Sequence, residues 1–238
     1  MSDGRVCRLL QLPGLSDYAG ALTLQRELAR ARIEGRLADD ALILLEHGRV
    51  ITLGRGADRS NITATSESLV RHGFEVHEIE RGGDVTYHGP GQLVGYPIID
   101  LQHHRKDLHW YLRSLEEALI RALRAYGVEG ERVPGYTGVW VENRKIASIG
   151  VHVTRWVTFH GFALNVTTDL ADFGFIVPCG IDAVEMTSIE REAAQAPSLA
   201  AVADEVAGRF AEVFDLRLAP FEDRLLEGLS LAQRSQHE

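Results

Sequence analysis

Apolar and polar positions along the chain follow helical spacing in some segments and strand spacing in others. Within the helical segments apolar residues recur every three to four positions, with Ser16 or Asp17 available as the first N-cap and Gly73 as a C-cap. The pattern predicts helices over residues 17–36, 65–73, 107–126 and 198–215. The third of these is the clearest, because its leucines and Tyr111 form one continuous stripe.

Short apolar runs and alternating segments fill the intervals between the helices and predict strands. These strands cover residues 41–47, 48–54, 74–80, 92–101, 138–153 and 157–166. We expect 48–54 to be the hairpin partner of 41–47, and Glu142-Asn143-Arg144 to form a turn that divides 138–153 into two strands. The alternation in 74–80 indicates a half-buried strand, and Pro97 indicates an edge or a bulge in 92–101.

The order of these elements indicates one α/β domain of the α+β type. Strands come in hairpin-like runs between helices, which favours a mainly antiparallel or mixed sheet flanked by helices over a regular doubly wound fold. We find no internal repeat, no low-complexity linker and no sharp change of composition. We therefore predict a single domain over residues 1–220 and a C-terminal tail over 221–238 that is partly disordered.

Composition excludes several classes of protein. The 238 residues carry a formal net charge of −9, and this excess of acid argues against a nucleic-acid binder. Two distant cysteines make no disulfide framework, and the ten histidines show no metal-ligand spacing. No segment resembles a signal peptide, and none approaches the roughly 20 apolar residues of a membrane span. We expect a cytoplasmic protein that binds neither membranes nor metal.

Cys179 is the first candidate for chemistry, in the run I-V-P-C-G-I. Pro178 restricts the backbone before it, and Gly180 can adopt conformations closed to other residues. A cysteine held on such a turn suits a nucleophile. A buried structural cysteine would fit the same local sequence, because free cysteine is among the most buried residue types. Cys7 lacks this setting, and we interpret it as a strand residue without a catalytic role.

The densest cluster of candidate ligand-binding groups is R-G-G-D-V-T-Y-H-G-P-G-Q, residues 81–92. Glycine pairs allow close approach of a backbone to a ligand, and Arg81, Thr86, Tyr87 and His88 add polar groups. A plain connection between strands is the alternative, but it does not require so many polar side chains around the glycines. The spacing matches neither a P-loop nor a dinucleotide-binding fingerprint.

Two further segments contain residues suited to a site. Lys145, in R-K-I-A-S-I-G-V, begins an apolar strand; facing inward it would serve as an acid–base group, although an exposed lysine at a turn is the commoner case. In H-G-F-A-L-N-V, residues 160–166, Gly161 indicates either close backbone approach or a β-bulge.

These four segments together resemble the octanoyltransferases of lipoate biosynthesis, which transfer octanoyl groups from acyl carrier protein to proteins. That family's signature is R-G-G-x-x-T-[aromatic]-H-x-x-G-Q, then K-I-A-S-[LI]-G, then H-G-x-A-L-N-[VI], then P-C-G. All four are present here in the same order, and the similarity extends from about residue 40 to about residue 190.

The resemblance implies roles for individual residues. It implies that Cys179 takes the acyl group as a thioester and that Lys145 activates this cysteine. The positions matching the family's substrate-binding segments are Arg81, Gly82, Gly83, Asp84, Val85, Thr86, Tyr87, His88, Ser148, Ile149, Gly150, Gly161, Phe162 and Ala163. It further implies a fold similar to the catalytic domain of biotin and lipoate protein ligases, and a reaction that needs no cofactor.

The same resemblance implies two protein partners. The donor would be octanoyl–acyl carrier protein, and the acceptors would be the apo lipoyl domains of 2-oxoacid dehydrogenases and the glycine cleavage H protein. Such partners are mostly acidic, so a chain of charge −9 needs a local basic face. The candidate basic residues are Arg55, Arg59, the run at 103–106, Arg144, Lys145 and Arg155.

Several hypotheses about the reaction remain open at this point. Tyr87, Leu93, Phe162 and Leu164 are candidates to line an acyl tunnel or to pack in an ordinary core, and His88 is a second candidate acid–base group. The alternatives for the whole chain are an ATP-dependent lipoate or biotin protein ligase, a non-catalytic binding module, and a cysteine thioesterase. L-G-R-G-A-D-R, residues 53–59, superficially resembles a loop of the biotin ligases but lacks its second Gly-Arg spacing.

Overall fold

Two sheets form the framework of the protein. A computed structural model describes residues 4–178 and 184–222. In these residues the large sheet has eight strands in the order β11-β1-β2-β6-β10-β9-β8-β7, and the small sheet has the order β4-β3-β5. The large-sheet strands are β1 (Arg5–Ser16), β2 (Asp40–His47), β6 (Gln92–Ile98), β7 (Glu131–Val133), β8 (Tyr136–Val141), β9 (Arg144–Thr154), β10 (Val157–Asn165) and β11 (Leu216–Pro220). The small-sheet strands are β3 (Val50–Leu53), β4 (Glu75–Glu78) and β5 (Val85–His88).

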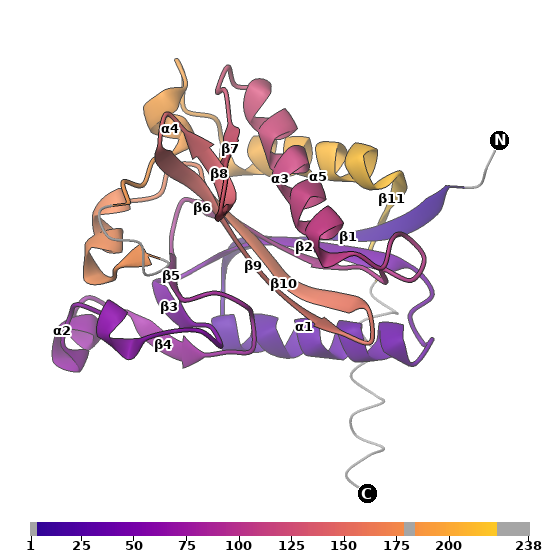
Figure 1. Ribbon diagram of the computed structural model, residues 1–238, viewed down its shortest axis with the longest axis horizontal. Coiled ribbons are helices and arrows are strands. Elements are labelled where there is room, and N and C mark those ends of the chain that lie inside the picture. Colours follow the sequence, from indigo (N-terminus) through magenta and orange to yellow (C-terminus); the bar gives the residue numbers. More distant parts are fainter. Residues whose placement is uncertain (1–3, 179–183, 223–238) are drawn as a thin grey trace, which may run out of the picture.

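Helices cover both faces of the large sheet. The helices are α1 (Tyr18–Ile33), α2 (Ser66–Arg71), α3 (Leu108–Arg124), α4 (Ile189–Glu192) and α5 (Leu199–Phe214), with 3₁₀ turns η1 (Arg59–Asn61) and η2 (Leu170–Phe175). Helix α1 lies along one face, and α3 and α5 pack together on the other, while α2 lies with the small sheet (Figure 1). Each face buries its own cluster of apolar side chains. No helix in the described part of the chain is long and apolar enough to cross a membrane.

The predicted fold class and the four predicted helices are confirmed. The sheet is mixed, because β1 runs parallel to both β2 and β11 while the other pairings of the large sheet are antiparallel. Asp17 caps α1 by accepting from Gly20 N at 2.6 Å, and the predicted turn at Glu142 and Asn143 joins β8 to β9 with positive φ at both residues. Strand β11 carries no clear pattern in the sequence, and it forms by adding to the edge of β1.

Two strand predictions were wrong. Residues 48–54 do not pair with 41–47, because β2 already has β1 and β6 as neighbours, and β3 instead joins β4 and β5. Strand β6 is central rather than an edge strand, although it contains Pro97. The proline is tolerated because the β6–β10 ladder ends at Gly95, and the Thr158 hydroxyl donates to the Pro97 carbonyl at 2.9 Å.

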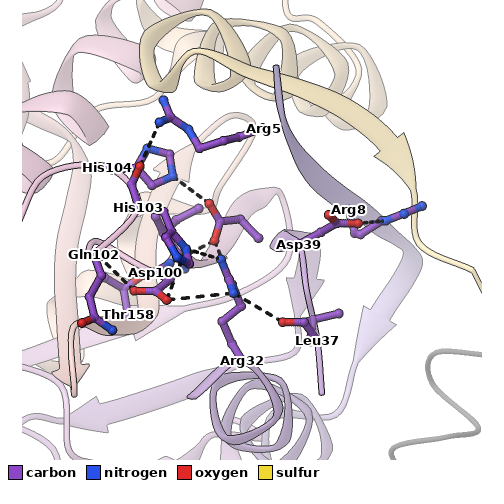
Figure 2. Close-up of polar contacts among 12 residues, drawn as sticks. Arg5, Arg8, Arg32, Leu37, Asp39, Asp100, Gln102, His103, His104 and Thr158 are labelled. Atoms are coloured by element: carbon purple, nitrogen blue, oxygen red, sulfur yellow. Dashed lines mark hydrogen bonds and ion pairs between the residues drawn. The ribbon is translucent and has the colours of Figure 1, made fainter. Parts of the chain in front are cut away.

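A buried group of charged side chains ties the start of β2 to the loop between β6 and α3 (Figure 2). The Asp40 carboxylate accepts from Arg32 Nε at 3.2 Å, from the Asp100 amide at 3.0 Å and from His104 Nε2 at 2.7 Å. Arg32 also contacts His103 Nδ1 at 3.0 Å. This cluster, which we call the Asp40 clasp, holds the loop that leads into the first turn of α3.

Candidate functional site

A cavity of about 420 Å³ lies against the part of β9 that extends beyond its pairing with β8. Cavities of this size are typical of small-ligand sites. The described residues that line it are Tyr18, Ile79, Arg81, Gly82, Gly83, Asp84, Thr86, His88, Tyr96, Leu108, Leu112, Gly135, Tyr136, Thr137, Lys145, Ser148, Ile149, Gly150, Val151, His160, Gly161, Phe162 and Ala163. Three of the four motif segments of the sequence thus meet around one space.

The glycine-rich loop at the cavity is held in place from two sides. The Gly82 amide donates to the Val151 carbonyl at 2.9 Å, which attaches the loop to the free edge of β9. The buried Arg81 guanidinium donates to the Thr52 carbonyl at 2.8 Å and to the Thr52 hydroxyl at 2.9 Å. Arg81 therefore fastens the loop to β3 as well as lining the cavity.

The segment over residues 53–59 supports this loop from behind. The Arg55 amide donates to the Arg81 carbonyl at 3.0 Å, and the Gly56 amide donates to the Gly83 carbonyl at 3.2 Å. The Asp84 carboxylate accepts from the Asp58 amide at 3.1 Å, which closes the same contact. Residues 53–59, which superficially resemble a biotin-ligase loop, therefore support the glycine-rich loop.

Strand β5 divides its side chains between the cavity and the small core. Thr86 and His88 line the cavity, while Val85 and Tyr87 lie in the apolar cluster of the small sheet. The Tyr87 hydroxyl donates to Asp172 Oδ2 at 2.7 Å, away from the cavity. Of the four candidate tunnel residues, Phe162 lines the cavity, whereas Leu93 and Leu164 belong to the main core.

A chain of buried hydrogen bonds connects the three motif segments. His88 Nδ1 lies 2.9 Å from Gln92 Oε1, and Gln92 Nε2 donates to Asn165 Oδ1 at 2.9 Å. Asn165 Nδ2 in turn donates to the Thr187 carbonyl at 2.9 Å, and the Thr187 amide donates to the Lys145 carbonyl at 2.9 Å. The polar residues of the motifs therefore form one network that ends at the backbone of Lys145.

Two histidines at the cavity have strongly lowered pKa values. Burial, and then the nearby His47, lowers the pKa of His88 to about 3. Burial also lowers the pKa of His160 to about 4, against the opposing effect of Glu80, whose carboxylate lies 3.6 Å from His160 Nε2. Both imidazoles are therefore neutral near neutral pH, and His88 is suited to hold a hydrogen bond rather than a charge.

Lys145 faces inward, as the prediction for an acid–base lysine requires. The residue is 2 % exposed, and its Nζ lies 5.3 Å from the centre of the Trp140 ring. Its amide donates to the Glu185 carbonyl at 2.8 Å, so the segment after the P-C-G motif pairs with the start of β9. Ser148, Ile149 and Gly150 follow on the same strand at the cavity.

Cys179 lies outside the described residues, so its predicted role as nucleophile stays a prediction. Cys7 is described and is fully buried in β1, where burial and the neighbouring Asp40 raise its pKa. A native-state reaction with a thiol reagent is therefore not expected at Cys7, because the reactive thiolate is disfavoured there.

The candidate basic residues are spread over the molecule. Arg144 pairs with both Glu142 and Glu192 at 3.1 Å, and Arg59 pairs with Glu78. Arg155 follows the last residue of β9, at the opposite end of that eleven-residue strand from Lys145. His103 and His104 belong to the Asp40 clasp. A docking face built from these residues remains a prediction.

The sequence did not reveal several cavity residues. Leu108 and Leu112 were assigned to the core stripe of α3, but they line the cavity instead. Tyr18, Tyr96 and Tyr136 come from segments without any motif. Their proximity depends on how α1, β6 and β8 pack. His160, within H-G-F-A-L-N-V, has a positive φ of 56°, which the sequence does not reveal.

Comparison with known proteins identifies related sequences and folds. The model of the lipoyl protein ligase A/B catalytic domain matches residues 17–211. The chain is 51 % identical to an octanoyltransferase of Solibacter usitatus, over 91 % of this chain and 96 % of that protein. It is 54 % identical to an octanoyltransferase of Rubrobacter xylanophilus, over 85 % and 91 % of the two chains.

Solved structures of lipoate protein ligases share the fold. Lipoate-protein ligase A bound with ATP superposes with a TM-score of 0.76 at 17 % identity, covering 94 % of this chain and 92 % of that one. The bi-partite lipoate protein ligase of Thermoplasma acidophilum superposes with a TM-score of 0.68 at 18 % identity, covering 96 % and 91 %. The predicted likeness to lipoate protein ligases is thus confirmed at the level of the fold.

Proposed function

The chain belongs to the octanoyltransferases with a lipoyl protein ligase A/B catalytic domain, and we propose that it relays octanoyl from acyl carrier protein to lipoyl domains. The relay is a thioester on Cys179. The observation that carries the proposal is the cavity itself, where the glycine loop, the K-I-A-S strand and the H-G-F-A-L-N strand meet beside the buried Lys145.

The first half of the reaction transfers the acyl group to the enzyme. Lys145, as the neutral amine, takes the thiol proton of Cys179, and the thiolate attacks the carbonyl carbon of octanoyl–acyl carrier protein. The bond to the carrier sulfur breaks, and Lys145 returns the proton to that sulfur. The products are the octanoyl thioester of Cys179 and the free carrier thiol.

The second half transfers the acyl group to an acceptor lysine. Lys145 takes a proton as the ε-amine of the apo lipoyl domain attacks the carbonyl carbon of the Cys179 thioester. The bond to the Cys179 sulfur breaks, and Lys145 passes the proton to that sulfur, which restores the free thiol. The acceptors we propose are the lipoyl domains of 2-oxoacid dehydrogenases and the glycine cleavage H protein. Because a thioester already activates the acyl group, amide formation needs neither ATP nor another cofactor. We propose that this occurs in the cytoplasm.

The cavity offers apolar contacts for the acyl chain. Ile79, Leu108, Leu112, Ile149 and Phe162 contribute apolar surface to its lining. Burial of methylene groups is worth about 0.8 kcal/mol each, so an octanoyl chain gains several kcal/mol from such a site. Our proposed binding surface for the acyl chain consists of the cavity-lining residues of the motif segments: Arg81 to Asp84, Thr86, His88, Ser148 to Gly150 and Gly161 to Ala163.

Intact-protein mass spectrometry tests the relay. Incubation with octanoyl–acyl carrier protein is expected to add one octanoyl group that hydroxylamine removes, and Cys179→Ala is expected to abolish it. Cys7→Ala is the matched control and is expected to acylate normally, because Cys7 is buried away from the cavity. Full transfer by Cys179→Ala would overturn the proposal.

The role of Lys145 and the rival functions need separate measurements. Lys145→Arg keeps a positive charge but no usable proton, so we expect turnover to fall more than the alkylation rate of Cys179. Equal losses would mean that Lys145 acts through its charge alone. A requirement for ATP would identify a ligase, release of free octanoate a thioesterase, and the absence of any acyl adduct a binding module.

A further inference from the structure

Glu116 is a buried carboxylate on α3 that has no part in the proposed relay. Its side chain is 0 % exposed, and Oε2 accepts from Arg113 Nη1 at 2.6 Å and from Arg132 Nε at 3.0 Å. A buried carboxylate is costly to desolvate, and a well-packed apolar residue often replaces such a group without loss of stability. Its presence here calls for a role beyond packing.

The other oxygen of Glu116 holds the backbone of β8. Oε1 accepts from the Gly138 amide at 3.2 Å. Gly138 has φ of +131° and lies between Tyr136 and Trp140, where the register of β8 against β7 shifts. A bulge of this kind removes an amide from the regular ladder, and a buried amide then needs another acceptor. Glu116 supplies that acceptor from the neighbouring helix.

Gly138 forms the wall against which Lys145 packs. A Cβ at position 138 would lie 2.8 Å from Lys145 Cε, 3.6 Å from Lys145 Nζ and 2.5 Å from the Ala147 carbonyl oxygen. No Cβ fits there, because it would lie closer than 3 Å to both the Ala147 carbonyl oxygen and Lys145 Cε. The Trp140 ring, two residues further along β8, also contacts Nζ. The position of the bulge therefore sets the position of the amine.

We propose that Glu116 is a positioning residue for Lys145, acting through the Gly138 amide. The inference rests on the proposed role of Lys145 in the transfer. Glu116 touches neither the lysine nor the cavity; it fixes the backbone wall that keeps Nζ at its place beside the Trp140 ring. Glu117, next on the same helix, pairs with Arg121 and Arg132 and makes no such contact with β8, so it is the matched control.

Lysine NMR tests the position of the amine without any assay of activity. The chain has two lysines, Lys106 and Lys145, so ¹³C-lysine labelling gives two CεH₂ signals. The ring current of Trp140 is expected to displace the Lys145 signal from the ordinary position held by the exposed Lys106. Glu116→Ala is expected to move the Lys145 signal toward that of Lys106, whereas Glu117→Ala is expected to leave it in place.

Two more variants separate the amide bond from the ion pair. Arg113→Met removes one ion pair but keeps the Gly138 bond, so the Lys145 signal is expected to stay. If the alanine variant does not fold, Glu116→Gln is used, because one carboxamide oxygen cannot satisfy two arginines and Gly138 together. A folded Glu116 variant with an unmoved Lys145 signal, or an equal shift in Arg113→Met, would overturn the inference.

Kinetics provide the second readout. Misplacing a catalytic group by about 1 Å costs on the order of 10²-fold in rate, so Glu116→Ala is expected to lower kcat by about this factor and to leave KM within about twofold. A raised KM with unchanged kcat would contradict positioning. If the wild-type chain transfers no octanoyl, the proposed function fails, while the NMR comparison still decides the role of Glu116.

Discussion

Asn165 has more structural partners than its place at the end of a strand would suggest. Its amide group bridges the glycine-loop motif and the segment that pairs with Lys145, through bonds to Gln92 and to the Thr187 carbonyl, both at 2.9 Å. All these groups are buried, so none can exchange a lost partner for bulk water. The side chain therefore belongs to the support of the site, although it does not line the cavity.

Replacing Asn165 by alanine is expected to lower both stability and transfer. Unsatisfied buried polar groups cost about 1–3 kcal/mol, so denaturant unfolding should show a loss of that order. Transfer should fall further than this loss of stability explains, since the backbone beside Lys145 loses its support. Ser114→Ala, which removes a buried hydroxyl bonded to the Trp110 carbonyl at 2.9 Å, is the control. Equal transfer rates in both variants would contradict the argument.

Between elements, the decisive contacts are those that position one end of a helix or strand. The Asp40 clasp brings the last turn of α1, the start of β2 and the loop before α3 together (Figure 2). Leu108 and Leu112, in the first turns of α3, line the cavity. The clasp therefore acts at a distance on the shape of the cavity, by fixing where α3 begins.

The clasp should contribute strongly to stability. Asp40→Ala leaves His104 buried without a carboxylate and leaves Arg32 with only the more distant Asp100, at 3.9 Å. Removing one partner of a buried pair typically costs about 3–5 kcal/mol. The adjacent Asp39 pairs with Arg8 at 2.7 Å in a more exposed position, so Asp39→Ala should cost no more than about 1 kcal/mol. Denaturant unfolding of the two variants makes the comparison. Similar losses would mean that the clasp is no stronger than a surface pair.

The stability of the whole molecule should depend on pH through its buried histidines. His88 and His160 have folded-state pKa values of about 3 and about 4, below the ordinary value of about 6.5 that applies in the unfolded chain. Below pH 6.5 the unfolded chain takes up protons that the folded chain does not. The contribution of these histidines to the free energy of unfolding is therefore complete above about pH 6.5. It decreases as the pH drops toward their folded-state pKa values.

Each histidine contributes a slope of up to about 1.4 kcal/mol per pH unit in this window. Arg26 is the chief cause of the low pKa of Glu80, about 2. Glu80 therefore adds a further loss of stability as the pH falls below about 4.5. Urea unfolding between about pH 7 and pH 5 measures the slope. His160→Asn should reduce it by one histidine's share, because asparagine tolerates the positive φ of 56° at this position. An unchanged slope would show that His160 titrates normally.

The sequence by itself determined the four predicted helices, most of the strands and the motif segments that line the cavity. Helices such as 107–126 were predictable because their apolar residues recur with the helical period. The motif glycines, Lys145 and the H-G-F-A-L-N strand were recognisable because unusual residues occur there at fixed spacing. These signals depend on near neighbours in the chain. They need no knowledge of the distant packing.

Only the tertiary structure decided which segments meet. Residues 48–54 could pair with β2 only if an edge of β2 were free. The distant strand β1 occupies that edge, so β3 joins the second sheet. Tyr87 points away from the cavity and Leu108 points toward it. Both orientations follow from the faces that β5 and α3 present to their neighbours. The bond from Glu116 to Gly138 is likewise invisible in sequence, because it joins a helix to a strand bulge that neither segment specifies alone.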